Sequence, residues 1–139
     1  MSSRHRARQY AVQMLYQWDL LASTPRHVLE YFWTGEDAAP EERRFAENLF
    51  HRVVECAPEL NPIIERHSTN WRLERMSVID RNILRLGAYE LLYERQTPIS
   101  VILDEAIELA RDLSSEDAAR FINGILDKVG RLRDHGDTR

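Results

Sequence analysis

Apolar residues recur at steps of three and four along almost the whole chain, which is the spacing of one face of an α-helix. No segment alternates apolar and polar residues with the period of two that a strand needs, so we expect an all-α protein. The stripes predict about seven helices, near residues 4–21, 25–32, 40–57, 62–67, 77–93, 101–113 and 117–129.

Local signals mark where several of these helices begin. Two pairs combine a side chain that can cap a helix with a proline in the first helical turn, and one pair resembles a capping box. The predicted caps are Thr24-Pro25, Asn61-Pro62 and Ser77 with Asp80.

Two glycines carry further structural information. Gly87 lies inside a predicted helix, where glycine costs about 1 kcal/mol relative to alanine, so it indicates the close approach of another helix. Gly130 follows the last apolar stripe and predicts the C-cap of the final helix.

The composition excludes several classes of protein. The chain has 139 residues and a formal net charge of −4, which suits a single globular domain. Its apolar runs are too short for a membrane span, and no apolar stretch follows the N-terminal arginines as in a secretory signal. One cysteine, Cys56, excludes an internal disulfide and a multi-cysteine zinc site, so we expect a cytoplasmic protein.

The first predicted helix offers a candidate binding face. Arg4, Arg6 and Arg8 have no acidic residue near them in the sequence, and a helical wheel places Arg6, Gln13 and Tyr16 opposite the apolar stripe. Guanidinium groups bind phosphates, a ring stacks on a base and amides read base edges, a combination that suits single-stranded RNA. The alternative is a solvated helix end, or one that contacts an acidic protein.

The helix near residues 101–113 carries acids instead. Asp104 and Glu108 are four residues apart and share a face, which suits a basic protein partner or an ordinary solvated surface. Catalytic patterns are weak: Cys56 and His51 lie in one helix without a third orienting group, and the histidines lack ligand spacing. We therefore expect no enzyme activity, no cofactor and no metal.

Longer blocks of residues carry a family resemblance. The opening Arg6-Ala7-Arg8, the segment Ala11–Tyr16, the central Asp80–Leu91, then Asp104–Ala110 and Phe121–Lys128 are similar, in order and spacing, to the NusB family of transcription antitermination factors. The resemblance implies two small helical bundles packed together in one domain. We place the N-terminal subdomain at about 1–75, the C-terminal one at about 76–130 and a polar tail at 131–139.

The resemblance also implies a function and its residues. The family binds boxA RNA of ribosomal RNA leader transcripts together with NusE, a ribosomal protein, and helps RNA polymerase read through terminators. A scaffold that binds only proteins is the alternative, and periodicity does not distinguish a monomer from a homodimer. The implied RNA-binding residues are Arg4, Arg6, Arg8, Gln13, Tyr16, Asp80, Phe121 and Asn123, and the partner-binding residues are Asp104, Glu108 and Asp117.

Overall fold

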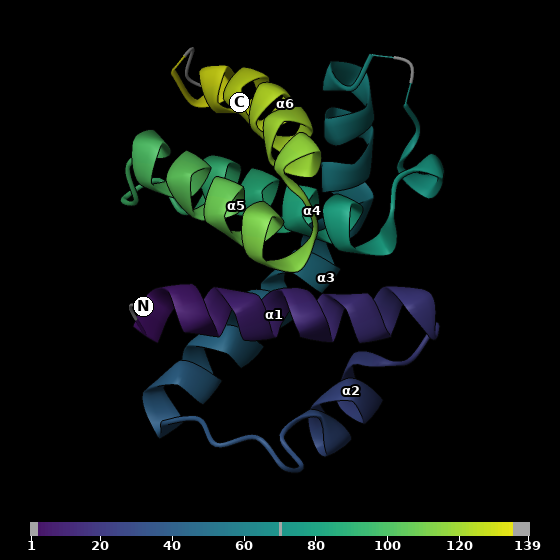
Figure 1. Ribbon diagram of the computed structural model, residues 1–139, viewed down its shortest axis with the longest axis vertical. Coiled ribbons are helices and arrows are strands. Elements are labelled where there is room, and N and C mark those ends of the chain that lie inside the picture. Colours follow the sequence, from purple (N-terminus) through teal and green to yellow (C-terminus); the bar gives the residue numbers. More distant parts are fainter. Residues whose placement is uncertain (1–2, 70, 135–139) are drawn as a thin grey trace. The chain divides into compact units, whose positions relative to one another are not determined.

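The computed structural model describes residues 3–69 and 71–134, and every regular element in them is helical. This confirms the all-α prediction, with six α-helices and one short 3-10 turn in place of about seven helices. The elements are α1 (Ser3–Leu20), α2 (Pro25–Phe32), α3 (Pro40–His67), the 3-10 turn Leu73–Arg75, α4 (Val78–Tyr93), α5 (Ile99–Leu113) and α6 (Glu116–Asp134), as Figure 1 shows.

Helix α3 is longer than its sequence predicts. The pair Asn61-Pro62 was expected to begin a new helix, but α3 continues through both Pro58 and Pro62, so this prediction is wrong. Each proline removes only its own N–H from the helix, and the neighbouring turns continue on either side. The side chain of Asn61 accepts a hydrogen bond from Arg85 Nε at 3.0 Å instead of capping a helix.

The other two predicted caps are confirmed. Thr24 Oγ1 accepts a hydrogen bond from the backbone N–H of His27 at 3.1 Å, and Pro25 occupies the first turn of α2. Ser77 Oγ accepts from the backbone N–H of Asp80 at 3.1 Å and caps α4. Each of these bonds joins residues three apart, so local sequence is enough to predict it.

The chain divides into two compact units, Met1–Glu55 and Cys56–Arg139. This boundary falls inside α3, whereas the sequence placed it near residue 75, in the connection that follows α3. The second half of α3 belongs with the later helices because its polar side chains bond to α4. Besides the Asn61–Arg85 bond, Glu59 Oε1 accepts a hydrogen bond from the hydroxyl of Tyr93 at 3.2 Å.

The N-terminal unit contains an aromatic cluster where α1 meets α2. The ring of Tyr10 lies edge-on to Phe32 and Trp33, with centroids 6.0 and 5.1 Å away. Trp33 Nε1 donates to Glu47 Oε2 of α3 at 2.6 Å, which gives the indole N–H its partner. Burial first, and the carboxylates of Glu36 and Glu42 next, raise the pKa of Tyr10 above its usual value.

The C-terminal unit is organised by close contact between α4 and α6. A Cβ added at Gly87 would lie 2.5 Å from Cδ1 of Leu126, so the predicted close approach at this glycine is confirmed. Gly130 is also buried, and its added Cβ would lie 3.3 Å from Ile99 and 3.5 Å from Leu91.

Gly130 is therefore a packing residue inside α6, and its prediction as a C-cap is wrong. The helix continues to Asp134, so residues 131–134 are helical although the sequence assigned them to a polar tail. The rest of the predicted tail, residues 135–139, lies outside the described residues.

One arginine near the end of α6 satisfies carbonyl groups in the last turn of α4 and in the connection that follows it. Arg133 Nε donates to the carbonyl of Leu91 at 2.8 Å, and Nη1 donates to the carbonyl of Thr97 at 2.7 Å. Its Nη2 donates to the carbonyls of Glu90 and Glu94 at 3.1 and 3.2 Å. A cation at a helix C-terminus also interacts favourably with the helix dipole.

Among the helices of residues 3–69 and 71–134, none combines the length and the apolar character that a bilayer span requires.

Two glycines of the C-terminal unit should respond oppositely to substitution. Gly124 lies in α6 with no atom within 4 Å of an added Cβ, so Gly124→Ala should stabilise the protein by about 0.5–1 kcal/mol through the better helix propensity of alanine. Gly87→Val should destabilise it by about 1–3 kcal/mol, because the new side chain would collide with Leu126. Urea unfolding measures the free energy of unfolding of both variants. Equal changes in that free energy would contradict the close contact of α4 and α6 at Gly87.

Candidate nucleic-acid interface

Two arginines of α1 lie against one ring of α3. The guanidinium carbon of Arg4 is 4.1 Å from the centroid of Phe45, and that of Arg8 is 5.5 Å from it. Residues four apart share a helix face, which is why both reach the same ring. Arg4 is exposed, but Arg8 is only 6% exposed. The structure thus leaves Arg4 accessible to a ligand, whereas Arg8 is a buried cation that packs on an aromatic ring.

Arg6 has an acidic neighbour that the sequence did not indicate. Its Nη1 lies 3.9 Å from Oε2 of Glu42, in α3. The side chain of Arg6 is 48% exposed, whereas that of Glu42 is 8% exposed. The ion pair is long and its arginine end is half-exposed, so Arg6 can exchange the carboxylate for a phosphate.

The remaining predicted residues of α1 lie further along the same helix. Gln13 is exposed and Tyr16 is half-buried. Gln13 follows Arg6 by about two turns and so lies on nearly the same line of the helix, while Tyr16 is about 60° around from Gln13. Arg6 and Tyr16 are separated by about 15 Å along the helix axis. The helix therefore presents a cation, an amide and a partly exposed ring along one side.

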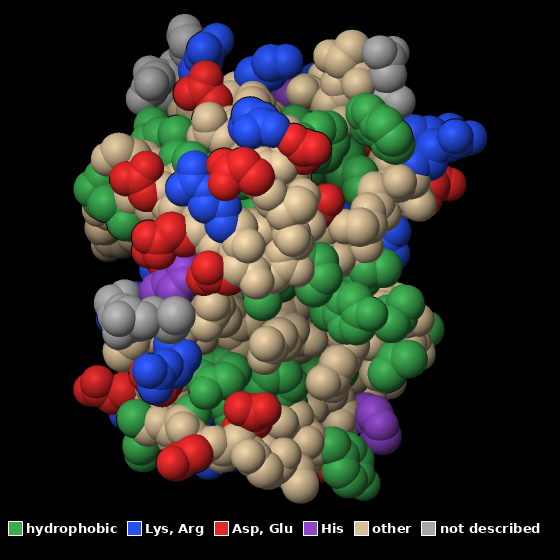
Figure 2. All heavy atoms as spheres, in the orientation of Figure 1, with side chains coloured by type: hydrophobic (Ala, Val, Ile, Leu, Met, Phe, Trp, Pro, Cys, Tyr) green, Lys and Arg blue, Asp and Glu red, His purple; other side chains and the backbone are tan. Residues whose placement is uncertain are grey.

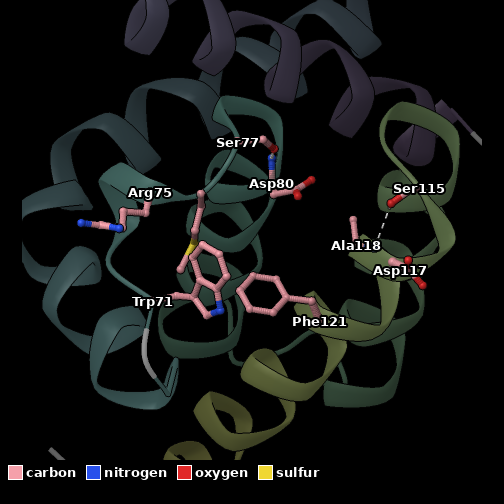
Figure 3. A pocket seen from close by; sticks show the side chains of 9 residues that line it. Trp71, Arg75, Ser77, Asp80, Ser115, Asp117, Ala118 and Phe121 are labelled. Carbon is pink, nitrogen blue, oxygen red and sulfur yellow. Dashed lines mark hydrogen bonds between the residues drawn. The ribbon is translucent and has the colours of Figure 1, made fainter.

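The C-terminal unit holds a pocket that contains three more of the predicted residues. Figure 3 shows it between the segment that precedes α4, the first turn of α4 and the first turns of α6. Its volume is about 350 Å³. The lining residues are Trp71, Arg75, Met76, Ser77, Asp80, Ser115, Asp117, Ala118 and Phe121.

An aromatic pair lines one side of this pocket. The rings of Trp71 and Phe121 have centroids 6.4 Å apart and meet edge to face at 77°. Trp71 is 48% exposed, so a large aromatic side chain lies partly in solvent beside the pocket. Sequence reasoning predicted Phe121 but missed Trp71. The sequence did carry a signal for Trp71. It is a tryptophan in a polar stretch between two predicted helices, and it belongs to no apolar stripe that would explain it as a core residue.

The two carboxylates of the pocket differ in their surroundings. Asp80 has its Oδ1 atom buried, and no donor among the described residues bonds to that atom. Figure 3 shows its carboxylate pointing from α4 toward the first turn of α6. Asp117, which was predicted as partner-binding, is exposed and forms an ion pair with Arg120. Asn123 is half-buried further along α6 and is not among the lining residues.

The predicted acidic face on α5 is exposed to solvent. Asp104 and Glu108 are both exposed, whereas Glu105 beside them is half-buried. Figure 2 shows acidic side chains interspersed with basic ones over α5 and α6. This surface can pair with a cationic partner, but its charge is mixed.

Comparison with known proteins agrees with this set of features. The model of the NusB family matches residues 5–131. The chain is 41% identical to the transcription antitermination protein NusB of Myxococcus xanthus, over 93% of this chain and 95% of that one. Among solved structures, NusB of T. maritima has a TM-score of 0.81 at 32% identity, covering 92% of this chain and 90% of its own. A NusB solved with NusE in complex with dsRNA has a TM-score of 0.85 at 26% identity, covering 95% of this chain and 98% of its own.

The different surroundings of Arg6 and Arg8 predict different effects on folding. Arg8→Ala should destabilise the protein by about 1–2 kcal/mol, because it removes a buried guanidinium that packs on Phe45. Arg6→Ala should stay within about 0.5 kcal/mol of the wild type, since its ion pair is long and half-exposed. Thermal unfolding of the two variants checks this, and a larger loss for Arg6→Ala would contradict it.

Proposed function

The chain belongs to the NusB family, and we propose that it acts as a transcription antitermination factor that binds boxA-type single-stranded RNA together with the ribosomal protein NusE. In this role it helps RNA polymerase read through terminators in ribosomal RNA operons. The names of its relatives support antitermination, and the NusB solved with NusE and dsRNA supports NusE and an RNA as partners. The protein works by binding rather than by catalysis, in the cytoplasm where transcripts are made.

The observation that carries the proposal is the exposed polar side of α1. Arg4 and Arg6 present guanidinium groups at the start of the helix, and Gln13 presents an amide two turns after Arg6. Phosphate contacts supply most of the affinity for a nucleic acid, and amides can hydrogen-bond to base edges. Tyr16, half-buried on the same helix, offers a ring for stacking. Arg8 supports this surface from beneath by its contact with Phe45.

The pocket of the C-terminal unit favours an unpaired strand. A base can enter a pocket of aromatic rings only when it is splayed out of a duplex, as in single-stranded loops and ends. Trp71 and Phe121 offer such rings, and Asp80 offers hydrogen-bond acceptors beside them. Asn123, further along α6, can add a contact to the same strand outside the pocket.

The acidic surface of α5 is our proposed contact for NusE. A ribosomal protein that binds RNA carries basic patches, and such patches fit carboxylates that stand in solvent. Asp104 and Glu108 meet that condition on α5, and Asp117 meets it at the start of α6.

Charge reversal on α1 tests the RNA contact. Arg6→Glu should weaken binding of boxA RNA at least tenfold at low salt. It should also make the affinity less dependent on salt, by the amount that the loss of about one phosphate contact gives. Arg26→Glu is the matched control, because it makes the same charge change at an exposed position of α2. Fluorescence anisotropy at two salt concentrations measures both variants.

Equal losses in the two variants would mean that only the net charge matters. Unchanged affinity in Arg6→Glu would contradict RNA binding by α1 and would favour a scaffold that binds only proteins. A duplex of the same RNA should bind more weakly than the single strand, because its bases are not free to stack on protein rings.

Charge reversal on α5 tests the protein contact. Asp104→Lys should weaken NusE binding about three- to tenfold, mainly by slowing association, since exposed charges act chiefly on the rate of encounter. Glu55→Lys makes the same change at an exposed position of α3 and serves as the control. Surface plasmon resonance with immobilised NusE gives both rates. Equal association rates for the two variants would exclude this face of α5 as the docking surface.

A further inference from the structure

We propose that Glu42 is a competing carboxylate that limits how tightly Arg6 binds an RNA phosphate. The residue belongs to neither of the two binding sets that the family resemblance implies, and its role is to lower affinity rather than to supply it. This inference rests on the proposed function as an RNA-binding protein, and it concerns how the affinity of the cationic end of α1 is controlled.

Glu42 is held in place more firmly than its partner. Its side chain is 8% exposed, and it lies in the first turn of α3, where a negative charge interacts favourably with the helix dipole. The side chain of Arg6 is 48% exposed, so the guanidinium can bind a ligand from solvent while the carboxylate stays in position. A phosphate that binds Arg6 therefore approaches a negative charge that is fixed to α3.

The packing of α1 against α3 keeps the two groups close together. Phe45 follows Glu42 by three residues and so lies on the same side of α3. The guanidinium carbons of Arg4 and Arg8 lie 4.1 and 5.5 Å from the centroid of that ring. Arg8 is buried, so its contact with Phe45 is part of the packing between the helices. The carboxylate of Glu42 is thus kept beside α1 when Arg6 changes its partner.

The distance is short enough for the carboxylate and a bound phosphate to repel each other. Arg6 Nη1 lies 3.9 Å from Glu42 Oε2, and a phosphate oxygen that bonds to the same nitrogen lies about 2.9 Å from it. With the guanidinium in this position the two oxygens are at most about 7 Å apart, which is less than the Debye length of about 10 Å at 0.1 M salt. Unit charges at that separation weaken binding about threefold even at the dielectric constant of water, and by more beside a buried group.

A small cavity that Glu42 lines contains further charged groups. Its volume is about 200 Å³, and it lies between the first turns of α1 and α3. Its lining includes two guanidinium groups and two carboxylates, which belong to Arg4, Arg44, Glu41 and Glu42. A phosphate at this end of α1 therefore meets acidic groups as well as arginines, although no acid lies near the arginines of α1 in the sequence.

The effect of this carboxylate does not depend on the base sequence of the RNA. Binding of unrelated strands comes almost wholly from phosphate contacts, whereas a specific strand adds contacts to its bases. A carboxylate that weakens the phosphate contacts lowers both affinities. Unrelated strands then bind very weakly, but the specific strand keeps its base contacts. Glu42 thus makes base recognition necessary for a stable complex.

Removal of the charge should strengthen RNA binding. Glu42→Gln keeps the shape of the side chain, and it should tighten binding of boxA RNA and of an oligouridine of equal length by about three- to tenfold each at about 0.1 M salt. The gain should shrink as salt rises, because salt screens the repulsion. A purely structural role for Glu42 predicts the opposite, since its loss would disturb the surface that binds RNA. Fluorescence anisotropy without NusE measures the affinities.

Further variants identify the charge and the group on which it acts. Glu42→Asp keeps the charge and should stay within about twofold of the wild type, whereas Glu42→Ala removes it and should repeat the gain of Glu42→Gln. In an Arg6→Ala background, Glu42→Gln should change the affinity less than about twofold, because the phosphate contact that the carboxylate opposes is absent. Glu55→Gln controls for net charge: it makes the same change at an exposed position of α3 and should alter the affinity less than about twofold.

The outcomes separate this inference from the proposed function. If boxA RNA binds and depends on Arg6, but Glu42→Gln and Glu42→Ala bind no more tightly than Glu55→Gln, the competing carboxylate is wrong and the antitermination role stands. The inference is also wrong if only boxA RNA gains affinity, if the full gain persists without Arg6, or if circular dichroism shows that neither variant of Glu42 folds. If the wild type and every variant bind no RNA, both proposals fail.

Discussion

The close approach of α4 and α6 at Gly87 is the contact on which the pocket depends. Leu126 occupies the space that a side chain at Gly87 would need, so the two helices are held at a separation that only glycine permits. Asp80 precedes Gly87 by about two turns on α4 and therefore lies on nearly the same side of that helix. Phe121 precedes Leu126 on α6. Asp80 and Phe121 thus stand on helices that a core contact fixes, which is the arrangement that precise recognition requires.

Some arginines of this protein stabilise the fold and others are exposed for binding, and composition does not distinguish the two groups. Arg85, which is buried, donates to Asn61 and Asn82, and Arg8 packs on Phe45, so both serve the fold. Arg6 remains half-exposed. The sequence could predict that α1 is cationic, but it could not predict which cations are buried. That depends on partners such as Phe45, which lies far away in the chain.

What the sequence predicts well is local. Helix periodicity and the caps at Thr24 and Ser77 involve residues within one or two turns, and both were predicted correctly. The continuation of α3 through Pro62 was not, since it depends on contacts with α4 that no local pattern contains. The residues of the candidate site also differ in whether sequence could predict them. Phe121 and Asp80 came from the family resemblance, whereas Trp71 becomes notable only when folding places it against Phe121.

The four carbonyl bonds of Arg133 have a consequence for how the chain is made. They join residues 36 to 43 positions apart, so the end of α4 obtains its partner only when the last helix is available. A ribosome delivers the N-terminal segments first, and the unit Met1–Glu55 has all of its residues long before α6 emerges. Assembly of the C-terminal helices is therefore delayed until α6 has been translated, and the end of α4 depends on that helix for its hydrogen-bond donors.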